Sequence, residues 1–190
     1  MDDDAKELMK IAAATVLQPV TKVVGDAIGV LGGDRLGAFR KANRAKWETY
    51  YTEERAKIDR ETETPDLRMA AEILGQAQDE SRDELLKIWA KLMAALLDER
   101  KAALCRREFV EIASKLEPLD AIALEVLANN GNLAPSRRDH VMQKAGATSD
   151  EVLLAFRNLE KLGLTSGMVG LGPGKPFLMP LGRQLLTVIS

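Results

Sequence analysis

The sequence predicts a mainly α-helical protein: an N-terminal body of long helices, followed by a C-terminal winged-helix module with a short β-hairpin. Ala, Leu, Glu, Lys and Arg dominate the chain, and aromatic residues make up only 4% of it. Up to about Gly163 the apolar residues recur at helical spacing. Beyond that point two short apolar stretches flank the turn "GPGK", which is the pattern of a hairpin. We therefore expect a helical body over residues 1–116 and a second module over residues 117–190.

The first predicted helix, over about residues 8–30, has a broad apolar face. Pro19 kinks this helix or splits it in two. The polar stripe is narrow, and the opposite side carries Leu8, Ala12, Val16, Val20, Val23, Ala27 and Val30. Because this face is too wide for a helix resting on water, it needs a partner. The partner is the body of the protein, another subunit or a bilayer surface.

A ladder of glycines follows, at every fourth position of "GDAIGVLGGDRLG": Gly25, Gly29, Gly33 and Gly37. Small residues at this spacing let helices approach closely, so the ladder suits an oligomer interface or contact with a membrane. Lys22 and Asp26 would each cost about 2.5 to 3.5 kcal/mol at the centre of a bilayer, which disfavours a lone transmembrane span.

The interpretation we favour for the ladder is a helix junction. Gly32 and Gly33 end the first helix in a left-handed cap, and Asp34 starts the next helix. The interface or membrane alternative stays open, and its contact residues would be Val16, Val20, Val23, Gly25, Ala27 and Gly29.

The second predicted helix runs from Asp34 as N-cap to about Arg60 and begins with a basic stretch. Trp47, Tyr50 and Tyr51 follow, and such amphipathic aromatics suit the headgroup region of a membrane. The candidate contacts for an anionic partner are Arg35, Arg40, Lys41, Arg44 and Lys46.

Two further helices complete the predicted body. One starts at Thr64 with Pro65 at its first position. The other covers about residues 85–97, and its core face carries Leu85, Ile88, Trp89, Leu92 and Leu96.

The last third of the chain predicts three helices, a hairpin and a closing helix. Pro118 opens a helix that reaches about Asn130, and Ser136 caps a short helix to Lys144. The stretch "TSDE" at residues 148–151 is a capping box for a helix that reaches Lys161. Two short strands and the final helix "LGRQLLTVIS" follow.

A winged-helix module suggests DNA binding, because the third helix of such a module commonly enters a major groove. Residues 117–190 carry seven basic and seven acidic side chains, so they offer no net positive field to phosphates. We therefore expect a packing or protein-interaction role for the module. The candidate contacts of the nucleic-acid alternative are Arg137, Arg138, Arg157 and Lys161.

Catalysis, metal binding and cofactor binding find no support in the sequence. Cys105 and His140 are the only residues of their kinds, and no third catalytic group accompanies them. The acidic cluster at residues 79–84 stands at a helix start, where solvated acids favour the helix dipole. "GLGPGK" lacks the Ser or Thr of a phosphate loop and indicates a wing. We expect no enzyme activity, no metal and no cofactor.

Global composition agrees with a soluble protein in a reducing compartment. The chain is 46% hydrophobic, and 27 basic against 29 acidic residues give a net charge of −2. A single cysteine excludes an intrachain disulfide, and no signal peptide opens the sequence. We expect a cytoplasmic protein with the capacity to associate with a membrane, present as a homo-oligomer or bound to a protein partner.

Several stretches resemble the abortive-infection alpha family of bacterial proteins. They are "AAEILGQAQDESRDELLKIWAKLMAALLDE" at residues 70–99, "RREFVEIASKLEPLDAIALEVL" at residues 106–127, "NLEKLGL" and "LMPLGRQLL". The resemblance implies a part in phage defence or a related conflict system and supplies no catalytic residues.

Three functional hypotheses follow from the residues and the resemblance together. The first is a non-enzymatic defence component that acts through protein–protein interaction or self-assembly, with the N-terminal helix pair as its working surface. The alternatives are a winged-helix transcription regulator on DNA and an effector that acts at a membrane surface through the N-terminal helix.

Overall fold

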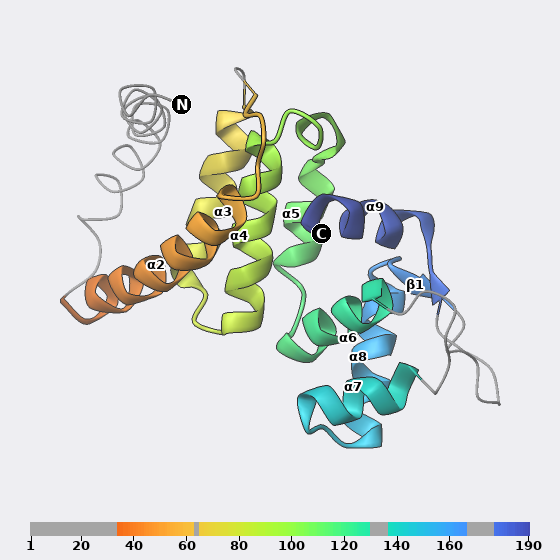
Figure 1. Cartoon of the computed structure of the whole chain (residues 1–190). Coiled ribbons are helices and arrows are strands. Elements are labelled where there is room, and N and C mark those ends of the chain that lie inside the picture. Colours follow the sequence, from red (N-terminus) through yellow and green to blue (C-terminus); the bar gives the residue numbers. More distant parts are fainter. Residues whose placement is uncertain (1–33, 63–64, 130–136, 167–176) are drawn as a thin grey trace, which may run out of the picture.

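The computed structural model describes residues 34–62, 65–129, 137–166 and 177–190, and these are mainly helical (Figure 1). A small antiparallel hairpin near the C-terminus is the one pairing of named strands in this part of the chain. The predicted first helix and its glycine ladder up to Gly33 lie outside the described residues.

The N-terminal half contains four helices, one of which is a buried central helix. They are α2 (Asp34–Arg55), α3 (Leu67–Asp79), α4 (Asp83–Leu97) and α5 (Arg107–Ala113), with a short 3₁₀ turn, η1 (Ala102–Leu104), before α5. The predicted core face of α4 is buried, and so are most of its other side chains. This all-round burial follows from its position, because α2, α3, α5, α6 and α9 all pack against it.

Two boundaries in this half differ from the prediction. Helix α2 ends at Arg55 rather than near Arg60, because the following residues run beside the end of α4, where Glu61 bridges to Asp98. Helix α3 begins at Leu67 rather than at Pro65, because Asp66 is its cap and accepts hydrogen bonds from the backbone of Arg68 and Met69, both at 3.0 Å. Helix α5 was not predicted at all.

The C-terminal half comprises α6 (Pro118–Asn129), α7 (Arg137–Ala145), α8 (Ser149–Lys161), β1 (Thr165–Ser166), β2 (Phe177–Leu178) and α9 (Pro180–Ile189). The predicted capping box of α8 is present, with Thr148 and Glu151 bonded reciprocally. The strands pair Thr165 with Leu178 and Ser166 with Phe177. Helices α6, α7 and α8 pack on one another, whereas α9 returns to α4.

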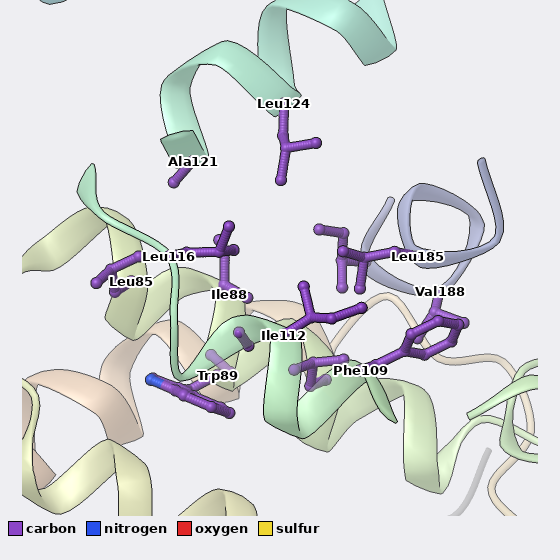
Figure 2. Close-up of a cluster of buried hydrophobic side chains, with 14 of the residues drawn as sticks. Leu85, Ile88, Trp89, Phe109, Ile112, Leu116, Ala121, Leu124, Leu185 and Val188 are labelled. Atoms are coloured by element: carbon purple, nitrogen blue, oxygen red, sulfur yellow. The ribbon is translucent and has the colours of Figure 1, made fainter. Parts of the chain in front are cut away.

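One hydrophobic core runs through both halves. Figure 2 shows Ile88 and Trp89 of α4 close to side chains of α5, α6 and α9. Trp89 is buried in this cluster, as predicted. Since α4 supplies side chains to both sides, it joins the two halves into one packed unit.

A buried carboxylate holds the start of α6 against α8. Asp120 accepts hydrogen bonds from the Glu117 backbone N–H at 2.8 Å and from Asn158 Nδ2 at 2.6 Å. Burial raises the pKa of Asp120, and these two donors oppose that rise. Both hydrogen bonds join residues of the fold, so the role of Asp120 is structural.

Candidate functional site

The N-terminal end of α2 and a groove beside it form the candidate site. Along most of α2 one face is buried, with Asn43, Trp47 and Tyr51 at helical spacing. Asn43 Nδ2 donates to the carbonyl oxygen of Gln78 at 3.1 Å, near the C-terminus of α3. The body therefore covers this face of α2 from Asn43 onward.

Toward its N-terminus α2 extends beyond the body, as Figure 1 shows for the orange helix. Leu36 and Phe39 continue the spacing of Asn43 and Trp47, yet each is 43% exposed. These two side chains, which we call the α2 apolar pair, were not singled out by the sequence analysis. Their spacing ahead of Trp47 is the signal that could have found them.

Three of the five cations expected to meet an anionic partner have acidic partners within the chain. Arg40 Nε lies 2.6 Å from Asp79, and Lys46 Nζ lies 3.2 Å from Asp83. The hydrogen bond from Arg40 to Asp79 raises the pKa of this guanidinium. Asp79 and Asp83 are therefore not simply solvated acids of a helix start, because they hold α2 against the corner between α3 and α4.

The remaining members of the basic stretch are placed as follows. Arg44 Nε lies 3.0 Å from Glu48 on the same helix. Lys41 is exposed, and the side chain of Arg35 lies outside the description.

Two of the three aromatic residues singled out on α2, Trp47 and Tyr51, are packed inside the fold rather than placed for a membrane headgroup region. Trp47 and Tyr51 are buried and stacked, with ring centroids 5.0 Å apart. Burial raises the pKa of Tyr51 to about 12. Tyr50 is half-buried under Lys87, whose ammonium lies 5.3 Å from the ring centroid. The interpretation that these aromatics suit a headgroup region is therefore wrong for Trp47 and Tyr51.

A groove of about 530 Å³ opens between α2, α4, α6 and α9. Its apolar floor includes Ile88, Ile122, Leu186 and Ile189. Acidic residues from three helices line it as well, namely Glu53, Glu54, Glu84 and Glu125. Lys57 and Lys144 neutralise two of these acids, through contacts of 2.8 Å to Glu54 and 2.6 Å to Glu125. Lys87 and Lys91 also line the groove, so it combines an apolar floor with a rim of mixed charge.

The candidate nucleic-acid contacts differ in their surroundings. Arg138 donates to the carbonyl oxygen of Ser149 at 2.8 Å and to its hydroxyl, so it links α7 to α8. Arg157 and Lys161 are exposed on α8, near Leu154, which is 63% exposed. The side chain of Arg137 lies outside the described residues. Only Arg157 and Lys161 are thus seen on a surface.

Cys105 and His140 are both partly buried. Burial raises the pKa of Cys105 to about 11, which keeps the thiol protonated at neutral pH. Within the part of the chain that the structure describes, no three His, Cys, Asp or Glu side chains gather as metal ligands.

In the part of the chain that the structure describes, no helix is both long and apolar enough to cross a bilayer. The candidate membrane contacts Val16, Val20, Val23, Gly25, Ala27 and Gly29 fall outside the described residues.

A family model described as abortive infection alpha matches residues 40–167. No curated protein and no solved structure matches the chain. The matched region covers most of α2, the central helix and the C-terminal helices as far as β1.

Proposed function

Because the chain belongs to the abortive infection alpha family, we propose that it is a phage-defence protein that acts by binding a protein partner or by self-assembly. Membership of the family indicates a role in abortive infection. The interaction mode is our proposal, in which the N-terminal helix pair, residues 8–31 together with α2, is the working surface. The chain works without catalysis, metal or cofactor in this account.

The α2 apolar pair is the observation that carries the proposal. Its two side chains lie on the packing face of α2, beyond the point where the body covers that face. Adjacent exposed apolar side chains on the packing face of a helix suit contact with a further apolar surface. In the sequence, residues 8–31, for which a broad apolar face is predicted, come shortly before this end of α2.

For the C-terminal half we propose a winged-helix arrangement of α6, α7 and α8 with the hairpin, used for packing and protein contact. Its balanced charge supports this use, and so does the internal bonding of Arg138. The regulator alternative retains Arg157 and Lys161 as its exposed cations.

Phage challenge tests the defence role directly. Bacteria that carry the intact chain should yield fewer plaques than bacteria with an empty vector, over a panel of unrelated phages. Unchanged plaque numbers across the whole panel would contradict the proposal.

A duplex-binding titration separates the two uses of the C-terminal half. At physiological salt we expect weak, sequence-independent binding that the substitution of Arg157 and Lys161 by Ala barely changes. Tight binding to one sequence that this double variant abolishes would favour the regulator.

A further inference from the structure

The α2 apolar pair and the groove belong to the same helix but lie apart along it. Phe39 stands eleven residues before Tyr50, which lines the groove, so the two are about 17 Å apart along the helix axis. Because α2 is one unbroken helix over Asp34–Arg55, its N-terminal end cannot bend back to the groove of its own chain. These apolar side chains can therefore enter the groove of another molecule only.

We propose that the N-terminal end of α2 in one copy of the chain docks in the groove of a second copy, with Leu36 and Phe39 against the apolar floor. Figure 1 shows this end of α2 pointing away from α6 and α9, which contribute the far side of the groove. The inference rests on the proposed function in one respect, that the chain acts by self-assembly. It adds which two surfaces meet.

The apolar parts of the two surfaces match. Leu36 and Phe39 are three positions apart on the helix, so they point to one side and can enter the groove together. At about 530 Å³ the groove is within the range of about 300 to 1,000 Å³ that is usual for binding pockets. Burial of a large aromatic and a leucine against Ile122 and Leu186 would remove apolar area from water on both copies.

Charge favours the same pairing. Glutamates outnumber lysines in the lining of the groove by four to two. Lys57 and Lys144 pair with Glu54 and Glu125, whereas Glu53 and Glu84 have no ion pair within the described part of the chain.

The docking end of α2 is basic, since residues 35–47 include no acid. Lys41 is exposed there and has no ion pair among the described residues. Docking would bring this ammonium group to a groove that holds two unpaired carboxylates, Glu53 and Glu84.

The contact is heterologous, because an α2 end meets a groove rather than a second α2 end. Each copy offers one of each, so the same contact can repeat from copy to copy. Assembly then covers the α2 apolar pair of one chain and the groove floor of its neighbour.

Mixing two variants of the full chain tests the contact. Phe39→Asp places a charge on the docking end, and Ala128→Arg fills the groove from α6 at an exposed position. By light scattering we expect the wild type to assemble and each variant alone to be monomeric. An equimolar mixture should form a pair with one copy of each, because one variant keeps its groove and the other keeps its α2 end.

Matched substitutions elsewhere serve as controls. Leu154→Asp places a charge on the exposed face of α8, and Ala103→Arg enlarges an exposed alanine of η1 that does not line the groove. Both should assemble as the wild type does. Leu36→Asp should repeat the effect of Phe39→Asp, and unchanged melting temperatures show that the variants are folded.

Three outcomes would overturn the inference. They are a monomeric wild type, single variants that assemble as the wild type does, and a mixture that stays monomeric. Loss of these associations in a chain that still reduces plaque numbers would refute the inference alone. The expected pairing in a chain that gives no protection would refute the proposed function alone.

A charge reversal checks the electrostatic match. Lys41→Glu, made in the Ala128→Arg chain, should weaken its pairing with the Phe39→Asp chain by about two- to fivefold, the usual worth of an exposed ion pair. Lys115→Glu is the matched control, since it reverses an exposed lysine outside both surfaces and should leave the pairing unchanged. Equal weakening by the two reversals would contradict the match.

Discussion

Gly182, in the first turn of α9, has no room for a side chain. A Cβ built there would lie 2.2 Å from the carbonyl oxygen of Leu164, in the chain just before β1. Because this neighbour is backbone that also accepts a hydrogen bond from Met179, it has little freedom to move. Close approach of α9 to the hairpin therefore depends on this glycine.

Gly182→Ala should lower the free energy of unfolding by about 1 to 3 kcal/mol, the usual cost of overpacking. Gly75→Ala is the matched control, since nothing lies within 4 Å of its Cβ position in α3. There alanine should raise stability by about 0.5 to 1 kcal/mol through helix propensity. Urea unfolding of both variants measures the difference. Equal effects of the two substitutions would contradict the described packing of α9.

Cys105 should be a slow nucleophile in the folded protein. Its pKa is raised to about 11 because burial disfavours the thiolate, and Lys101 only partly offsets this. At pH 8 we expect labelling with a maleimide far slower than that of the urea-unfolded chain. Equal rates in the two states would show that the thiol is open to solvent.

At the scale of elements, the capping box gives α8 its well-defined start. The Thr148 backbone N–H and hydroxyl donate to Glu151 Oε2, both at 2.7 Å. The backbone hydrogen bond, followed by that from the hydroxyl, lowers the pKa of Glu151 below its ordinary 4.5. Its folded-state pKa is thus depressed, so its contribution to stability is present at neutral pH and is lost as the pH falls below about 4.5.

Thr148→Ala should therefore destabilise the protein by about 1 kcal/mol at pH 7, the usual cost of losing an N-cap. The difference from wild type should shrink as Glu151 becomes protonated. Thermal unfolding at pH 7 and pH 4 measures it. A difference that grows toward acid pH would contradict the assigned role of Glu151.

Elements with local signals could be predicted from the sequence, and elements set by distant contacts could not. The capping box fixed the start of α8, and Pro118 marked the start of α6, because these signals lie within a few residues of the helix. The end of α2 depends on residues 58–62 lying against α4. The bridge there joins Glu61 to Asp98, which are far apart in the sequence, with α3 and α4 between them. No local sequence pattern predicts such a contact.

The candidate site, too, could be predicted from the sequence only in part. The basic stretch of α2 was visible in the sequence, but its ion pairs join Arg40 to Asp79 and Lys46 to Asp83, acids that are distant in the chain. The groove is likewise assembled from four helices, so no single stretch of sequence predicts it. What the sequence did show was an apolar N-terminal segment in need of a partner.

At the scale of the whole molecule, α4 couples the two halves. It packs against α2 and α3 on one side and against α6 and α9 on the other. Lys101, shortly after α4, also donates to the carbonyl oxygen of Ser190 at 2.7 Å and so fastens the end of α9. Shared core of this kind favours cooperative unfolding.

We expect calorimetry to show one unfolding transition. Ile88→Ala, in α4 at the floor of the groove, should move that whole transition to lower temperature, at a cost of about 2 to 5 kcal/mol. Two transitions, of which only one shifts, would mean that the C-terminal half folds on its own core.

Plaque formation on bacteria that carry variants of the chain tests the central claim most directly, that defence depends on an apolar interaction of the N-terminal helix pair. Val20→Asp places a charge on the apolar face of the N-terminal segment, and Leu154→Asp places the same charge on the exposed face of α8. The account predicts that Val20→Asp loses protection at unchanged melting temperature and expression, whereas Leu154→Asp protects as wild type does. Protection retained by Val20→Asp but lost on replacing Arg157 and Lys161 by Ala would contradict it.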